Sequence, residues 1–332
     1  MTAIDDQIRW ALNLPLPGLT LRDHRRAVEA LPDLGYGDVW TGEGGGLDAF
    51  TPLAAAAAWS PGLGVGTGVV PVFTRGPAVI AQTAAALADL AGGRLTLGIG
   101  TSVPAHVSAL NDVPFTKPVT RLRDTLRFLR AALRGDTVDQ EYETFTVRGF
   151  RLPRTSTVLP KVVVGALRPR MVQLGLSEGD GVITNVLTES DLTRVLDAAG
   201  PRPPGKEIVV KVFVCPTEDE DYARSAGRAF LGWILNQAPY RAFHDWLGRG
   251  DRLQETRARF DAGDRDAAGR ALPEDLVDAL WIHGSAAECH RQIARFAQEG
   301  ITSILLYVAP TPELLTGRAD LLDVLAGLRG GA

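Results

Sequence analysis

The sequence has few cysteines, few histidines, little net charge and no long apolar run. Among its 332 residues the two cysteines, Cys215 and Cys289, are far apart and match no metal or redox motif, so we expect reduced cytosolic thiols. The five histidines lack the spacing of metal ligands, so we expect no metal site. A net charge of −4 gives no reason to expect a nucleic-acid or membrane surface. No apolar run could span a bilayer, and the opening MTAIDDQIRW has no signal-peptide layout, so we expect a cytoplasmic protein.

What the sequence does contain is a series of short apolar segments that alternate with helical patterns. Residues 62–103 hold one complete unit, in which a helix begins at Pro77 and ends at Gly92 and Gly93 between two apolar strands. This alternation, without a linker, predicts one (β/α)8 barrel domain, an α/β TIM barrel, over residues 1–332. Insertions are expected after strands four and seven, the latter helical over 232–273, and a doubly wound sheet is the alternative fold. The eight strands are expected at 8–14, 38–42, 63–70, 95–99, 161–165, 181–184, 207–214 and 303–308.

Local signals place several helix starts. Thr188 with Asp191 is predicted to start a helix, and the run 217–220 and Ser285 with Glu288 have the spacing of capping boxes. His24 lies among arginines in the first predicted helix, where we expect it to be solvated. A hairpin is predicted around 144–152.

In a (β/α)8 barrel the functional site lies at the carboxyl ends of the strands. Small and polar residues follow several of the predicted strands, where they could receive a flat ligand against the backbone. The candidates are Asn13, Glu43, Thr67, Gly68, Val69, Val70, Gly100, Thr101, Ser102, Val103, Gly165, Ala166, Leu167, Arg168, Pro169, Arg170 and Asn185.

Glycines at 62, 64, 66 and 68 superficially resemble a dinucleotide fingerprint. They precede or lie within a strand instead of joining it to a helix, so the order is wrong for a Rossmann site. Glycine inside a strand packs poorly and needs a reason. Either a flat ring approaches the backbone, or the glycines make room for a bulky neighbour in the barrel.

Arg168 and Arg170 flank the start of a helix whose first residue is predicted to be Pro169. The macrodipole disfavours cations there, whereas a bound phosphate would accept the free N–H groups and the guanidinium donors. The residues therefore indicate a phosphorylated ligand. The alternative is that both arginines pair with surface carboxylates.

Two titratable residues are candidates for proton transfer. Glu43 directly follows the second strand. It is either an acid or proton shuttle, a hydrogen-bond anchor, or a solvated loop charge. His106 follows the fourth strand and is either a reserve proton donor or a surface histidine. No G-x-S-x-G elbow or Ser-His-Asp order supports hydrolase chemistry.

The run TGVVPVFTRGPAVIAQTAAALADLAGGRLTLGIGTS resembles the bacterial luciferase-like family, within it the actinobacterial oxidoreductases that use the deazaflavin coenzyme F420. Further matches are WALNLPLPG, LDAFTPLAAAAAW, PFTKPVTRLRDTLRFLRAAL, EYETFTVRGFRL, VVVGALRPRM and DGVITN. The similarity covers nearly the whole chain and is weakest over 232–280.

The resemblance implies a barrel, commonly dimeric, with a non-proline cis peptide behind the deazaflavin ring. Here that bond would join Gly68 and Val69. The cofactor's tail would lie along Gly100 to Val103, and its phosphate at Ala166 to Met171. Relatives that oxidise sugar phosphates carry a histidine after the acid of strand two, and here Glu43 is followed by glycine; their glutamate donor is replaced by Val103, and no equivalent of their phosphate-holding lysine is found.

The resemblance therefore implies an F420-dependent oxidoreductase that transfers a hydride to or from a small organic substrate, reducing a C=C or C=N bond. Glu43 would contact the ring or supply the proton, with His106 in reserve. One alternative is an FMN-dependent monooxygenase of the same superfamily. The other is a non-catalytic flavin-binding barrel.

Overall fold

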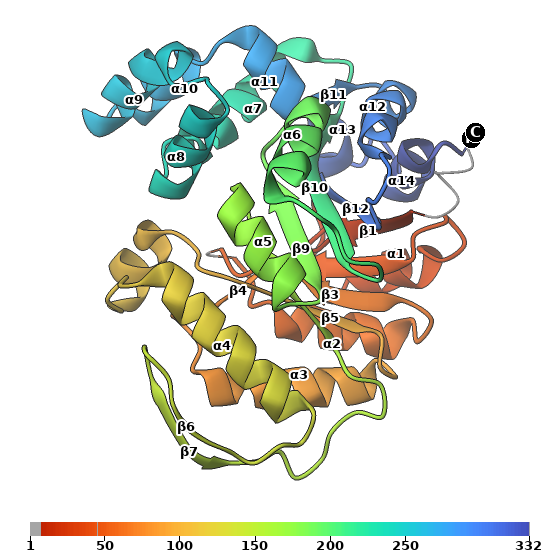
Figure 1. The fold of residues 1–332 in the computed structure, drawn as a ribbon. Helices are drawn as coiled ribbons and strands as arrows, with labels where there is room; N and C mark the ends of the chain where they lie inside the picture. Colours follow the sequence, from red (N-terminus) through yellow and green to blue (C-terminus); the bar gives the residue numbers. More distant parts are fainter. Residues whose placement is uncertain (1–7, 45, 332) are drawn as a thin grey trace.

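The computed structural model describes residues 8–44 and 46–331, and its centre is a closed barrel of eight parallel strands surrounded by helices (Figure 1). The barrel strands are β1 (Arg9–Asn13), β2 (Asp38–Thr41), β3 (Gly64–Thr67), β5 (Leu95–Gly100), β8 (Lys161–Gly165), β9 (Gly181–Asn185), β10 (Glu207–Pro216) and β12 (Ser303–Val308). They follow one another around the barrel in sequence order, and β10 closes it by pairing with β9 and β12. The predicted (β/α)8 barrel is confirmed, and the doubly wound alternative is wrong.

The predicted third strand is broken in two. After β3, the short strand β4 (Val70–Pro71) continues the pairing with β5. The bond between Gly68 and Val69, which separates β3 from β4, is cis, as the family resemblance predicts. One strand is new: β11 (Ile282–Gly284) pairs with the end of β10, and three residues are too few to show a period of two.

Helices cover the outside of the barrel. The predicted helix starts at Pro77 and Thr188 are confirmed, and so is the capping box at Ser285; Thr188 also forms a capping box with Asp191. The box predicted to open at residue 217 is wrong, because the helix there is capped by the Asp219 side chain. These outer helices are α1 (His24–Ala30), α2 (Phe50–Trp59), α3 (Pro77–Leu90), α4 (Pro118–Leu133), α5 (Pro169–Ser177), α6 (Glu189–Ala199), α7 (Glu220–Ile234), α12 (Ala286–Ile293), α13 (Pro312–Leu315) and α14 (Leu321–Arg329).

His24 is fully buried, which corrects the prediction that it is solvated. Its Nε2 accepts a hydrogen bond from the backbone N–H of Leu16 at 2.8 Å, and its Nδ1 lies 2.7 Å from the carbonyl oxygen of Thr20. The imidazole thus satisfies backbone groups of the loop between β1 and α1. Cys215 and Cys289 are free, as predicted, and both are buried.

The barrel interior is a packed layer of apolar side chains around Trp40, which is 1% exposed. A Cβ atom on Gly66 would lie 2.3 Å from the indole carbons of Trp40. Gly66 therefore makes room for a bulky neighbour, which was one of the two explanations offered for the strand glycines. The layer is formed by Ala11, Trp40, Val163, Ile183, Val209 and Leu305.

Two segments extend beyond the repeating barrel pattern. After β5 come a π-helical turn (Ala105–Ala109), α4 and the predicted hairpin, formed by β6 (Val138–Glu141) and β7 (Thr146–Phe150). After α7 come α8 (Ala238–Trp246), α9 (Gln254–Asp261), α10 (Arg265–Arg270) and α11 (Glu274–Leu280). Figure 1 shows α8 to α11 gathered at one end of the molecule, beyond α5 and α6. Within 8–44 and 46–331, no helix has both the length and the apolar character needed to cross a membrane.

A buried carboxylate ties the strands together at the amino end of the barrel. Glu207, 3% exposed at the start of β10, accepts hydrogen bonds from Arg9 Nη2 at 2.5 Å, from Lys161 Nζ and from Thr302 Oγ1 at 2.7 Å. Burial alone would raise the pKa of Glu207, but the contacts with Lys161, Arg9 and Thr302 outweigh it, so the pKa lies below its ordinary value. Glu207 is therefore held as an anion far from the carboxyl ends of the strands.

Candidate active site

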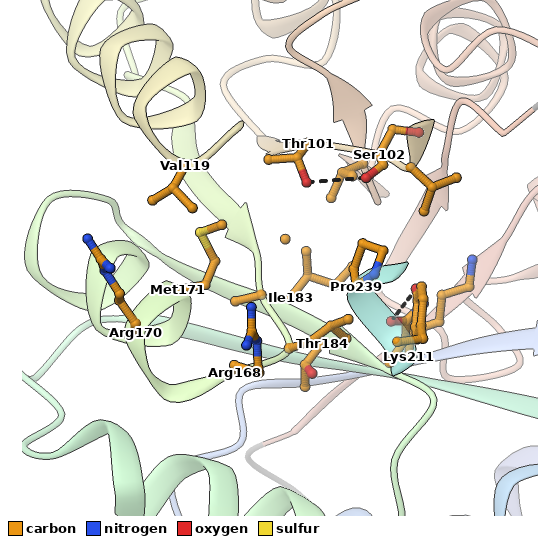
Figure 2. Close-up of a pocket in the computed structure, with 18 of the residues that line it drawn as sticks. Thr101, Ser102, Val119, Arg168, Arg170, Met171, Ile183, Thr184, Lys211 and Pro239 are labelled. Atoms are coloured by element: carbon orange, nitrogen blue, oxygen red, sulfur yellow. Dashed lines mark hydrogen bonds between the residues drawn. The ribbon is translucent and has the colours of Figure 1, made fainter. Parts of the chain in front are cut away.

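A cavity of about 550 Å³ opens at the carboxyl ends of β5, β8 and β9 and beside β10 (Figure 2). This size is typical of small-molecule and cofactor sites. Most residues that the sequence analysis nominated line it: Gly68, Val69, Gly100, Thr101, Ser102, Val103, Gly165, Ala166, Leu167, Arg168, Pro169, Arg170, Met171 and Asn185.

One wall of the cavity is built around the peptide between Gly68 and Val69. The Gly68 N–H donates to the Thr41 carbonyl at 2.6 Å, and the Val69 carbonyl accepts from the Glu43 N–H at 3.2 Å. A Cβ on Gly100 would lie 2.5 Å from Val69 Cγ2, so glycine is required for Val69 to lie flat against β5. The result is a low, apolar surface anchored to β2 by backbone hydrogen bonds.

The opposite character is found at the start of α5, where Arg168 and Arg170 are exposed at the cavity. Arg168 is the extended residue before the helix and Pro169 its first residue, as predicted. In the part of the chain that the structure describes, neither guanidinium forms an ion pair, so the alternative that they pair with surface carboxylates has no support among those residues. Figure 2 shows Arg168, Arg170 and Met171 on one side of the cavity and Lys211 on the other. The start of α5 thus offers two cations and the positive end of the helix dipole to an anion, although Pro169 has no N–H and the Met171 N–H already donates to the Arg168 carbonyl at 2.9 Å.

Two nominated residues are near the cavity but do not line it. Thr67 is fully buried, and its hydroxyl bridges to β5 by donating to the Gly98 carbonyl and accepting from the Gly98 N–H, both at 2.8 Å. Asn13 is 7% exposed and accepts a hydrogen bond from Lys211 Nζ at 2.8 Å. Thr67 is a structural bridge between strands, whereas Asn13 acts on a cavity residue. Val70 is fully buried in the core.

The two candidate proton donors lie together in a second hollow of about 640 Å³ that does not include the Arg168 cavity lining. Glu43 Oε1 accepts hydrogen bonds from Arg75 Nε at 2.7 Å and from the Ala49 N–H at 3.3 Å. The His106 ring lies 5.5 Å from the ring of Trp233, between centroids. Of the roles considered for Glu43, its side-chain contacts are those of a hydrogen-bond anchor.

Sequence reasoning missed the far wall of the cavity. It is formed partly by α8, whose Tyr240 hydroxyl donates to Asn185 Oδ1 at 3.1 Å. Burial raises the pKa of Tyr240 to about 12. Only long-range packing brings this helix to the cavity, so no local pattern could reveal it. The other missed lining residues are Val119, Ile183, Thr184, Lys211, Pro239 and Trp246.

Lys211 is the missed residue with a detectable sequence signal. It interrupts the apolar strand β10, and its side chain points to the cavity. Burial lowers the pKa of Lys211 to about 8. A lysine inside a strand that is otherwise apolar on both faces is unusual enough to nominate a site.

Comparison with known sequences places this geometry in a family. Residues 9–303 match the luciferase-like monooxygenase family. A 5,10-methylenetetrahydromethanopterin reductase of Methanolobus tindarius is 25% identical over 283 residues, which cover 82% of this chain and 85% of the relative. A Mycobacterium tuberculosis protein named as a coenzyme F420-dependent oxidoreductase is 27% identical over 317 residues, which cover 86% of this chain and 90% of the relative.

Solved structures share the fold at low sequence identity. The coenzyme F420-dependent tetrahydromethanopterin reductase of Methanopyrus kandleri superimposes with a TM-score of 0.78 at 18% identity, with 97% of each chain covered. An F420-dependent secondary alcohol dehydrogenase, solved with an F420–acetone adduct, gives a TM-score of 0.76 at 16% identity over 98% of each chain. With most of its length matched by the family and its barrel shared with these enzymes, the chain belongs to the luciferase-like monooxygenase family and is an oxidoreductase of that family.

Proposed function

We propose that this protein is a coenzyme F420-dependent oxidoreductase that transfers a hydride between the deazaflavin and a small organic substrate, reducing a C=N or C=C bond. The observation that carries the proposal is one cavity with a flat apolar wall at Gly68–Val69 and two unpaired arginines at the start of α5. The Mycobacterium tuberculosis relative that is named for coenzyme F420 supports the choice of this cofactor over FMN.

The residues fit a flat ring with an anionic tail. The ring would lie against the Gly68–Val69 peptide, where Gly100 removes the side chain that would displace Val69. The phosphate would lie at the first turn of α5, with Arg168 and Arg170 as donors. Thr101 and Ser102 line the path between these two places and can donate hydroxyl hydrogen bonds.

When bound, a deazaflavin supplies two-electron hydride chemistry. The chain's task is then to hold a substrate carbon against the ring and to exclude water. Ile183, Trp246 and Tyr240 line the part of the cavity left for the substrate. Because α8 supplies Tyr240 and Trp246, the segment after strand seven is expected to set substrate specificity.

A paired titration of the protein with F420 and with FMN, followed by fluorescence or calorimetry, tests the cofactor. We expect micromolar or tighter binding of F420 and weaker binding of FMN. Preference for FMN, with oxygen consumption when it is reduced, would move the protein to the monooxygenase alternative. Tight binding without turnover of any unsaturated substrate would leave the non-catalytic barrel.

The double variant Arg168→Ala, Arg170→Ala tests the anion site. Two charge-assisted contacts are lost, so the dissociation constant for F420 should rise at least about tenfold, which corresponds to about 1.4 kcal/mol. Arg148→Ala is the control, because Arg148 pairs with Asp139 on the outer hairpin. An unaltered constant in the double variant would refute the phosphate position.

The homodimer and the cytoplasmic location stay predictions. Light scattering of the purified protein tests the former, and cell fractionation the latter.

A further inference from the structure

Lys211 is an ammonium group held inside the mouth of the barrel. It lies on β10, faces the cavity, and donates from Nζ to Asn13 Oδ1 at 2.8 Å. Its Nζ also lies 5.6 Å from the centroid of the Phe213 ring and 5.5 Å from that of Tyr307. Across residues 8–44 and 46–331, no carboxylate forms a salt bridge with it. Its charge is therefore stabilised by one amide oxygen and two ring faces alone.

Such a site is expensive to keep. A partly buried ammonium without a counter-ion costs free energy, and the interior layer directly below it is apolar. Burial also brings the pKa of Lys211 to about 8, where a group can both give and accept a proton under neutral conditions. A lysine at this position therefore indicates a functional role for its ammonium group and not a packing role.

The order of strands places Lys211 opposite the flat wall of the cavity. Counted from β1, β3 is third and β10 seventh among the eight barrel strands, so they face each other across the axis. The Gly68–Val69 peptide follows β3 directly. A flat group that rests on that peptide therefore turns its free face toward the strand that carries Lys211, and a substrate stacked on the free face lies between them.

We propose that Lys211 is the proton-transfer residue of this oxidoreductase, with its Nζ giving a proton to the nitrogen of a C=N substrate. The proposal rests on the proposed function and narrows it. A reduced deazaflavin bound there would supply the hydride, with its electron pair, to the carbon and would itself be oxidised. The π electron pair of the C=N bond moves to the nitrogen, the Lys211 proton forms the N–H bond, and neutral Lys211 is reprotonated from water. An ammonium group hydrogen-bonds a lone pair on oxygen or nitrogen, which an isolated C=C bond lacks.

The groups that face Lys211 do not exchange protons near neutral pH, so proton transfer is assigned to Lys211. Asn13 on β1 and Asn185 on β9 do not titrate, and Asn185 is engaged by Tyr240 from α8. Tyr307 on β12 and Tyr240 both have pKa values raised by burial, so they stay protonated near neutral pH. Lys211 is thus the group on this wall that changes charge near pH 8.

The first test needs no cofactor. The chain has four lysines, so acylation of the apo-protein by a small reagent between pH 6 and 10 can be followed for each lysine by peptide mass spectrometry. Lys211 should reach half-maximal labelling near pH 8. Lys206, which donates to the Gly179 carbonyl outside the cavity, is the internal reference. Labelling that follows Lys206, or no labelling of Lys211 at any pH, would overturn the proposal.

The second test separates proton transfer from binding. Lys211→Met and Lys211→Arg should keep the F420 dissociation constant within about threefold and lower turnover by about 100- to 10,000-fold, because arginine keeps the charge but does not release a proton. In the reducing direction, wild-type turnover should fall as pH rises through 8, and Lys206→Met should keep that profile. Full turnover in Lys211→Arg would overturn proton transfer. If the wild-type protein failed to bind F420, the proposed function would be refuted. The labelling result would still test the proposed role of Lys211.

Discussion

Replacing Lys211 by methionine should make the protein more stable, although Lys211 contacts Asn13. Methionine is similar in length and apolar, so it can fill the same space without carrying a charge. The folded protein lowers the pKa of Lys211 from 10.5 to about 8 through burial, which means that folding works against the charged form.

The size of the effect follows from this difference in pKa. At about 1.4 kcal/mol per pH unit, the interval between 10.5 and about 8 corresponds to about 3 kcal/mol at pH 7. The variant also loses the 2.8 Å hydrogen bond to Asn13, worth about 1 kcal/mol. The expected net gain in the free energy of unfolding is about 2 kcal/mol, taking the smaller contribution from the larger.

Urea unfolding of the wild-type protein and Lys211→Met, at pH 7 and at pH 10, measures this gain. Between pH 8 and 10.5 the unfolded wild-type chain binds more protons at this residue than the folded one, so wild-type stability rises relative to the variant. The advantage of the variant is therefore largest below pH 8 and shrinks toward pH 10.5. An advantage that is absent at pH 7, or that does not change with pH, would refute the reasoning.

Three further predictions concern other parts of the barrel. Glu43→Gln should lower the free energy of unfolding by about 1.5–3 kcal/mol, because it removes the ion pair with Arg75. The control Glu29→Gln, in an exposed ion pair, should change the free energy of unfolding little. Unchanged turnover in Glu43→Gln would remove Glu43 from the mechanism. Gly66→Ala should destabilise by about 1–3 kcal/mol because its methyl group overlaps the indole inside the barrel, while Gly62→Ala meets open space and is the thermal-unfolding control. His244→Gln should flatten the acid loss of stability between pH 6.5 and 4: burial lowers the pKa of His244 from 6.5 to about 4, so its contribution is complete above pH 6.5 and lost as pH falls to 4.

The barrel was readable from the sequence because each strand–helix unit carries its own local signals. Pro77 starts a helix by its fixed geometry, and Thr188 with Asp191 caps another through side-chain hydrogen bonds. Arg168 and Arg170 were readable in the same way, since a helix start opposes cations wherever it occurs. The cis bond after Gly68 came from the family resemblance and not from composition or periodicity.

What the sequence could not supply depends on contacts between distant residues. Every residue of a parallel strand in a barrel faces a covered surface, so periodicity does not tell whether Lys211 points inward. Tyr240 reaches the cavity through a helix placed by tertiary packing. Glu43 was nominated by its position after a strand, but its role depends on Arg75, which is 32 residues away.

The carboxylate of Glu207 has a consequence for the order in which the chain can fold during synthesis. Its partners Arg9 and Lys161 precede it by 198 and 46 residues, and Thr302 follows 95 residues later. The first six barrel strands therefore leave the ribosome before their shared anion exists. Until β10 arrives, this incomplete barrel presents an open sheet edge and a lysine without its carboxylate, which is the kind of surface that chaperones retain. Thr302, next to the last barrel strand, supplies the last hydrogen bond to Glu207. Closure of the barrel and pairing of the charges at the amino ends of its strands therefore occur as one late event.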